Sequence, residues 1–253
     1  MMRMFRCEFM KTRRCYIFLT ALVISALGIC WGLYGNYTDV ILKHGWRMFL
    51  YQMPLVNAIF LPLLSMVVSS RICNIEHKGL MLKQLCCMES PGKLYDVKLL
   101  YGLGIICACV IIMWGTTIAF GMYKGFEGSL PVDLYLLYLL FTLVPTAVIY
   151  IFQHTLSLVF KNQAVSFFVG ILGEFIGIFS MFLPSVPALR KSVLWGYYGV
   201  LQFMGMFGWS KETRYETVHF DLIPIDWTFF GVLTAAGIII YLVGRYVFCR
   251  KEI

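Results

Sequence analysis

Six long apolar runs constrain this chain more than any other feature of its sequence. They cover about residues 16–34, 48–70, 97–120, 132–160, 164–184 and 228–248. A helix rises about 1.5 Å per residue, so each run can cross the roughly 30 Å hydrocarbon core of a bilayer. Backbone polar groups in hydrocarbon must be satisfied within their own segment, which favours helices. We therefore expect residues 1–253 to form one all-α transmembrane domain with six spanning helices.

The charged residues also indicate a membrane protein. They make up 13% of the chain, and hydrophobic residues make up 60%, whereas soluble domains contain roughly 25% and about half. A net charge of +8 would by itself be compatible with binding to nucleic acid. The charges, however, cluster at the ends of the apolar runs. We therefore expect contact with membrane lipid and none with nucleic acid.

Lysine and arginine are divided unevenly between the two sides that six spans define. One side receives fourteen of the 21: Arg3, Arg6, Lys11, Arg13, Arg14, Arg71, Lys78, Lys83, Lys93, Lys98, Lys161, Arg245, Arg250 and Lys251. Cytoplasmic loops of membrane proteins are enriched in these residues. The distribution predicts a multi-pass protein of the cell membrane with both termini in the cytoplasm.

The predicted cytoplasmic loop at 71–96 is the most informative segment. Met81, Leu82, Leu85 and Met88 recur near one helical face, and a Pro-Gly pair at 91–92 then interrupts the chain. We expect a short amphipathic helix that lies on lipid headgroups or docks into a groove of a partner protein. A solvated helical hairpin is the alternative.

The N-terminal stretch 1–15 is amphipathic as well. Phe5 and Phe9 are four residues apart, and Arg6, Arg13 and Arg14 are available for lipid headgroups. This pattern predicts a helix that lies in the cytoplasmic interface of the membrane.

The predicted outer loop at 185–227 contains an apolar stretch without charges, 193–209. Its length is marginal for a span, and a seventh span would move the basic C-terminus to the outer side. We interpret it as a re-entrant or interfacial helix. Trp195, Tyr198 and Trp209 lie in this stretch, and tryptophan and tyrosine favour the membrane–water interface, so we expect an aromatic outer rim.

Glu174 is the only carboxylate well inside a predicted span. A charge at that depth costs a few kcal/mol, so the side chain should face protein or water, or be protonated. One interpretation is a substrate contact or proton site, together with Trp195, Tyr198 and Trp209. The other is a hydrogen-bonded packing residue beside Gly170, Gly173 and Gly177, which permit close helix approach.

Several catalytic motifs are missing from the sequence. It contains no GxxxxGK[ST] loop for nucleotide phosphates, no HExxH pair for zinc and no GxSxG nucleophile elbow. The nine cysteines show no zinc-type spacing. We expect no catalytic residue, no metal site and no cofactor in this chain.

The layout resembles the type-2 ABC exporter permeases, and within them the permeases of lantibiotic immunity. The similarity combines a basic N-terminus, six spans, a long inner loop after the second span and a long outer segment before the sixth. In local sequence it covers about thirty residues: EHKG at 76–79, LKQL at 82–85, SP at 90–91, KLY at 93–95 and KLL at 98–100. Cys86 and Cys87 depart from the family, in which small or aliphatic residues are commoner.

The resemblance implies a bacterial permease subunit that expels an antimicrobial peptide or another amphipathic substrate. Gly79, Met81, Leu82, Leu85 and Met88 would belong to a coupling helix seated in a groove of a cytosolic ATPase subunit, and Glu76 would fix the start of that helix. ATP and Mg²⁺ would be held by the ATPase, and a second permease would complete a homo- or heterodimer.

Two other functions are compatible with the same spans. A membrane scaffold or peptide sensor would capture a peptide without transporting it and would need no ATPase. An intramembrane enzyme would use Glu174, His154 and His219. Its predicted residues, however, lie at different depths, with His154 near the cytoplasm and His219 outside.

Overall fold

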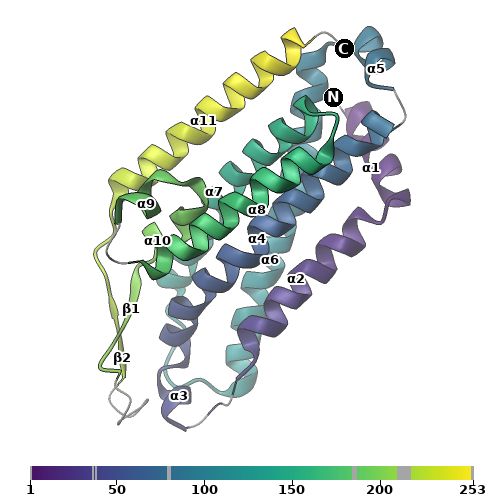
Figure 1. Ribbon diagram of the computed structural model, residues 1–253. Coiled ribbons are helices and arrows are strands. Elements are labelled where there is room, and N and C mark those ends of the chain that lie inside the picture. Colours follow the sequence, from purple (N-terminus) through teal and green to yellow (C-terminus); the bar gives the residue numbers. More distant parts are fainter. Residues whose placement is uncertain are drawn as a thin grey trace.

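The computed structural model describes residues 2–35, 37, 39–78, 81–183, 187–209 and 218–251, and it is mainly helical (Figure 1). The helices are α1 (Met2–Arg14), α2 (Ile17–Leu33), α3 (Asp39–Lys43), α4 (Gly45–Lys78), α5 (Leu82–Met88), α6 (Pro91–Lys124), α7 (Val132–Val159), α8 (Gln163–Phe182), α9 (Pro187–Ser192), the 3₁₀ turn η1 (Leu194–Gly196), α10 (Tyr197–Val200) and α11 (Trp227–Arg250). Two strands, β1 (Met204–Phe207) and β2 (His219–Leu222), complete the described elements.

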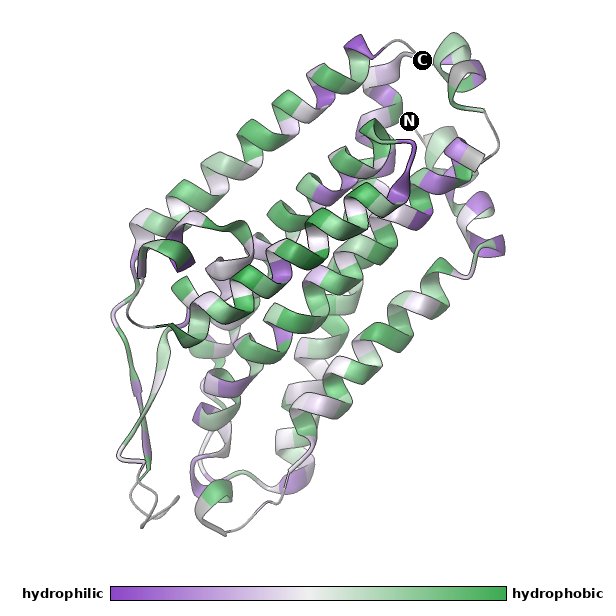
Figure 2. Ribbon diagram, viewed as in Figure 1, coloured by the Kyte–Doolittle hydropathy of each residue, from purple (hydrophilic) through white to green (hydrophobic). Residues whose placement is uncertain are grey.

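The long helices run side by side as one bundle (Figure 1). Helices α1 and α5 and the last turns of α11 lie at one end, which we call the N/C end, and β1 and β2 extend from the other, which we call the hairpin end. Apolar residues dominate the middle of the bundle, and hydrophilic ones gather toward its two ends (Figure 2). This distribution is the one expected for a protein surrounded by lipid.

Each of the six apolar runs lies on a helix, and five of these helices are long and apolar enough to span a membrane: α4, α6, α7, α8 and α11. Helix α2 has 17 residues and passes the same test only when it is joined to α1. The two helices are bent by 69° with respect to each other. The chain is therefore a multi-pass membrane protein, and its described residues contain five spans by this test, or six if the bent pair counts as one.

Helix α4 occupies the centre of the bundle. It packs against α2, α6, α7 and α8, and 72% of its apolar window is buried, compared with 22% for that of α11. Asn57 on α4 fits this interior because its amide donates a 2.6 Å hydrogen bond to the hydroxyl oxygen of Tyr138 on α7. A polar side chain at this position is satisfied within the bundle and needs no water.

The predicted loop at 71–96 is largely helical. Helix α4 continues to Lys78, and α6 already begins at Pro91. The additional turns are held by packing, because Ile72, Cys73 and Tyr95 are fully buried. Both helices therefore extend beyond their apolar runs at this end, and the bounds of the spans stay a prediction.

The stretch 193–209 does not form one continuous helix, and the domain is not purely helical. The turns η1 and α10 are followed by β1, which pairs antiparallel with β2 so that Met204 lies opposite Leu222 and Phe207 opposite His219. Strand pairing replaces helix in the second half of the stretch, which includes Gly205, a residue type with low helix propensity. The re-entrant or interfacial placement of the stretch stays a prediction.

Candidate functional site

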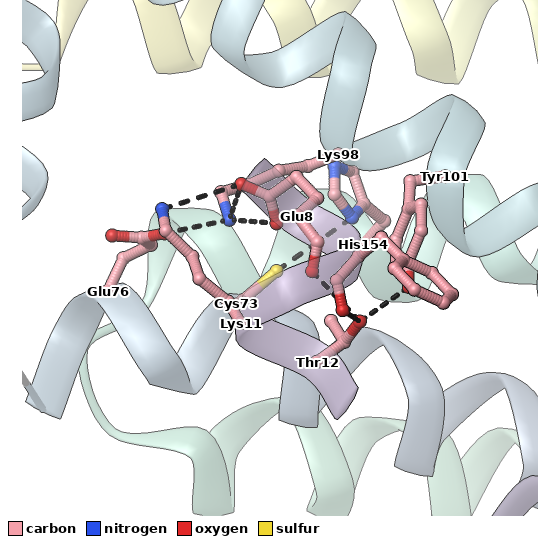
Figure 3. Close-up of polar contacts among 9 residues, drawn as sticks. Glu8, Lys11, Thr12, Cys73, Glu76, Lys98, Tyr101 and His154 are labelled. Carbon is pink, nitrogen blue, oxygen red and sulfur yellow. Dashed lines mark hydrogen bonds and ion pairs between the residues drawn. The ribbon is translucent and has the colours of Figure 1, made fainter. Parts of the chain in front are cut away.

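Four charged side chains meet inside the bundle at the N/C end (Figure 3). Nζ of Lys98 on α6 lies 3.0 and 2.9 Å from the two carboxylate oxygens of Glu8 on α1, and 3.1 Å from Oε1 of Glu76 on α4. Nζ of Lys11 on α1 lies 2.8 Å from the same oxygen of Glu76. We call Glu8, Lys11, Glu76 and Lys98 the charge cluster. It balances two carboxylates against two ammonium groups.

Three of the four side chains of the charge cluster are almost completely removed from solvent, and the fourth, Lys11, is 29% exposed. The side chain of Lys98 is 0% exposed, and those of Glu8 and Glu76 are 4% and 1% exposed. Charges so deeply buried are tolerated only when each has a partner, and removing one partner of such a pair typically costs about 3–5 kcal/mol. The charge cluster therefore fixes the mutual positions of α1, α4 and α6.

A second group of polar side chains surrounds the charge cluster. The thiol of Cys73 on α4 lies 3.8 Å from Nδ1 of His154 on α7, and His154 is fully buried. The ring of Tyr95 packs edge-on against that imidazole, and its hydroxyl lies 2.8 Å from Oγ1 of Thr155. Thr12 on α1 also shares a short hydrogen bond with Tyr101 on α6. These contacts extend the connection between helices to α7.

The predicted coupling helix corresponds to α5, which projects from the N/C end between α4 and α6 (Figure 1). The structure divides the predicted face in two. Leu82 and Leu85 pack against the hydrophobic core, whereas Met81 is 43% and Met88 73% exposed. The outward face is therefore formed by Met81, Met88 and the exposed Gln84. Gly79 lies outside the described residues.

Glu76 connects α5 to the charge cluster. Its backbone carbonyl accepts a hydrogen bond from the N–H of Met81, the residue before α5, at 3.2 Å. Its carboxylate points instead toward Lys11 and Lys98. Glu76 therefore contacts the start of α5 through its backbone, whereas its side chain joins α1 and α6.

The predicted polar site around Glu174 is only partly assembled. Trp195 in η1 packs against Gly173 and Gly177 of α8, on the turns that flank the half-buried Glu174. Tyr198 lies three residues after Trp195, and its hydroxyl is 2.8 Å from Oγ1 of Thr146 on α7. Glu174, Trp195 and Tyr198 therefore belong to one region.

Trp209 is separate from the other three residues. It follows β1 at the hairpin end, and its side chain is 52% exposed. By contrast, Trp195 and Tyr198 are buried. Of these three aromatic residues, Trp209 is exposed, whereas Trp195 and Tyr198 contribute to the packing of the bundle, and the outer rim stays a prediction.

The sequence indicated two members of the charge cluster only indirectly. Glu8 is the one acidic residue in the basic stretch 1–15. An isolated carboxylate in such a stretch indicates that it pairs with a basic residue inside the protein. Lys98 was grouped with the basic residues of the loop, but it lies inside α6 with no exposure. The intramembrane-enzyme interpretation finds no common site, because His154 is buried beside Cys73 near the N/C end and His219 lies on β2.

Neither the curated proteins nor the solved structures include a match to this chain. The family described as ABC-2 family transporter protein matches residues 4–180. The matched region spans α1 to α8 and includes the whole charge cluster and α5. It covers more than half of the chain, and the members of this family are the transmembrane components of transporters whose ATPase is separate. The chain therefore belongs to the ABC-2 transporter family and is a membrane permease of an ABC exporter.

Proposed function

We propose that the ATPase subunits of this exporter bind at the N/C end, on the outward face of α5. That face combines the exposed thioether side chains of Met81 and Met88 with the exposed Gln84. A short amphipathic helix with exposed methionines suits a hydrophobic groove on a partner protein, since methionine adapts to irregular surfaces. The inward-facing Leu82 and Leu85 support this function by attaching the helix to the bundle.

One observation carries the mechanism: Glu76 belongs both to the chain that enters α5 and to the charge cluster. A displacement of α5 by the ATPase pulls on the last turn of α4. Because the buried charges must stay paired, Lys98 on α6 and Lys11 on α1 follow that movement. The charge cluster thus transmits motion from α5 to α1 and α6, as required for switching between two arrangements of the spans.

The remaining architecture follows from this assignment. Helix α2 forms the first of six spans, α1 lies before it in the cytoplasmic interface, and both termini are in the cytoplasm. Exposed basic side chains on α1, such as Arg13 and Arg14, favour that orientation. The permease pairs with itself or with a second permease, and two ATPase subunits hold ATP and Mg²⁺.

The cargo is an amphipathic molecule, and a lantibiotic or similar antimicrobial peptide fits best. The exposed Trp209 and Phe207 at the hairpin end support this choice, because aromatic side chains bind both peptide and interfacial lipid. Glu174 on α8, beside Trp195 and Tyr198, offers a polar contact for the cargo on its way through the membrane. A scaffold or sensor that captures a peptide without an ATPase is the alternative function.

Co-purification tests the docking proposal. The protein is isolated in mild detergent from its own cells, and the proteins that accompany it are identified by mass spectrometry. We expect an ABC ATPase subunit to accompany the wild type and to be lost from the Met81→Asp/Met88→Asp variant. Tyr123→Asp is the matched control, because Tyr123 is 83% exposed near the opposite end of α6.

The outcomes separate the two functions. Loss of the ATPase in the α5 variant, with the control unchanged, supports docking on α5. Equal recovery in both variants contradicts docking on α5. Absence of any ATPase from a folded wild-type preparation contradicts the assembly with an ATPase and favours the scaffold or sensor.

A further inference from the structure

A cavity of about 400 Å³ opens between α1, α2 and α6 on the side of the bundle. Phe5 and Phe9 of α1 cover it from the N/C end, Phe18 and Leu22 of α2 form one wall, and Gly104 with its neighbours on α6 forms the other. The volume is in the range of ligand sites, about 300–1,000 Å³. Its lining is almost entirely apolar, so its occupant must present hydrocarbon.

The cavity opens toward the lipid and not toward the centre of the bundle. Four of its lining side chains are close to half exposed: Phe9, Leu22, Leu100 and Ile112. Helices α2 and α6 run along the membrane-crossing direction, and α1 turns away from α2 by 69°. The bend occurs at Tyr16, the residue before α2, whose φ of 54° places its backbone in the left-handed region. Helix α1 therefore lies across the end of the cavity.

The polar rim of the cavity is positively charged. Arg6 and Arg13 are exposed on α1, and a period of 3.6 residues places both next to the Phe5 and Phe9 side of the helix. Glu8 is the only acidic residue of α1, and Lys98 neutralises it inside the bundle. The exposed surface of α1 consequently carries positive charge without a compensating carboxylate.

We propose that this cavity binds one acyl chain of an anionic phospholipid, with the lipid phosphate held by Arg6 and Arg13. The apolar walls exclude water from the chain, and basic residues at the interface attract anionic headgroups. The site goes beyond the exporter assignment, because it requires neither cargo nor ATPase. A bound lipid would also wedge α1 against α6, beside the charge cluster.

Gly104 allows the cavity to be filled without disturbing the protein. Apart from its two chain neighbours and the backbone of its own helical turns, no atom lies within 4 Å of the position where a side chain would begin at Gly104. The same holds for Gly115, which lies eleven residues further along α6 and on the same helical face, outside the cavity. Gly104→Leu therefore blocks the cavity, and Gly115→Leu is its matched control.

Native mass spectrometry of the full-length protein, released from nanodiscs of phosphatidylglycerol and phosphatidylcholine, measures the bound lipid. Excluding two methylene groups from an apolar site lowers affinity about tenfold, so we expect at least that loss of phosphatidylglycerol in Gly104→Leu and none in Gly115→Leu. Equal retention by both variants overturns the proposal.

The charge requirement is tested separately. We expect Arg6→Gln/Arg13→Gln to lower phosphatidylglycerol binding by about thirtyfold and phosphatidylcholine binding by much less, because the choline cation offsets the phosphate charge. Arg14→Gln/Lys93→Gln removes the same charge from exposed positions at the same end and should have little effect. An equal loss in both double variants, or a wild type that binds both lipids alike, overturns the anionic headgroup contact.

A second copy of the chain is the competing occupant. Ala108 lines the cavity, so a chain carrying Ala108→Cys as its only cysteine reports on contact between two copies. We expect no disulfide-linked dimer in the presence of phosphatidylglycerol. An efficient cross-link would make the cavity part of an interface between copies and overturn the lipid site.

Discussion

The ammonium group of Lys98 lies 2.9 Å from a carboxylate oxygen of Glu8, and neither side chain has more than 4% of its surface exposed. The two residues come from α6 and α1, ninety positions apart in the sequence. This pair attaches the N-terminal helix to α6, beside the Lys11–Glu76 pair that attaches it to α4. Because the pair is buried, its contribution to the free energy of unfolding is large enough to measure.

Removing Lys98 should destabilise the protein strongly. Lys98→Met leaves the carboxylates of Glu8 and Glu76 buried with only Lys11 to balance them, and we expect a loss of about 3–5 kcal/mol in the free energy of unfolding. Urea unfolding in detergent micelles measures the change. In the double variant Glu8→Gln/Lys98→Met the pair of Lys11 and Glu76 stays balanced, so most of the loss should be recovered.

Lys93→Met provides the control for this prediction. Lys93 is two turns or less from Lys98 on α6, but its side chain is 68% exposed, and it faces Glu89 at 4.0 Å. Exposed ion pairs contribute about 0–1 kcal/mol. A similar loss in Lys93→Met and Lys98→Met would contradict a special role for the buried charges.

Two adjacent cysteines on α5 should differ in reactivity. Burial raises the pKa of the Cys86 thiol, and the side chain packs partly against the core, whereas Cys87 is exposed. The thiolate is the reactive form. At pH 7.5 we therefore expect single-cysteine variants to react with a maleimide more slowly at Cys86 than at Cys87.

The pH dependence follows from the same shift. A raised pKa keeps Cys86 protonated to higher pH, so its labelling rate should still increase above the pH at which a thiol of ordinary pKa has reached its maximum. Binding of the ATPase subunit to α5 should slow labelling at Cys87. Equal rates at the two positions, measured with the same reagent, would show that α5 does not pack as described.

The two tryptophans of the predicted cargo site should have different roles. Trp195 is buried against Gly173 and Gly177, so Trp195→Ala should cost about 3–5 kcal/mol of stability by leaving a cavity. Trp209 is exposed, and its replacement by alanine should change stability by no more than about 0.5 kcal/mol.

Peptide resistance of cells separates packing from cargo contact. If Trp209 contacts an amphipathic peptide, Trp209→Ala should lower resistance at an unchanged amount of protein in the membrane. Resistance at the wild-type level would remove Trp209 from the cargo contacts. Trp195→Ala is not informative on this point, because its loss of stability lowers the amount of permease.

Hydropathy predicted the positions of the long helices well, because burial in lipid depends mainly on composition along the chain. It did not predict the helical turns that extend beyond the apolar runs, where packing between helices decides the structure. The extra turns of α4 and α6 at 71–78 and 91–96 contain charged residues. They remain helical because their side chains have partners on other helices: Glu76 pairs with Lys98, and Tyr95 contacts Thr155.

The sequence patterns did not predict the charge cluster, for a similar reason. Its geometry depends on the bend at Tyr16, which turns α1 so that Glu8 reaches Lys98. Basic residues near the end of a span are expected to face the cytoplasm, and this rule placed Lys11 and Lys98 in solvent. The division of α5 into an inward and an outward face also depends on its neighbours, since Leu82 and Met81 are both apolar.

The central claim is that the charge cluster transmits motion from α5 to α1, and a distance between spin labels tests it most directly. Cys7 on α1 and Cys30 on α2 are both exposed, and they can be labelled as the only cysteines of the chain. In the complex with its ATPase, we predict that ATP changes the Cys7–Cys30 distance. The change should disappear in Glu8→Gln/Lys11→Met/Glu76→Gln/Lys98→Met, which removes both ion pairs that join α1 to α4 and α6 and leaves no charge of the cluster unpaired. An equal change in both proteins, or none in the wild type, would contradict the claim.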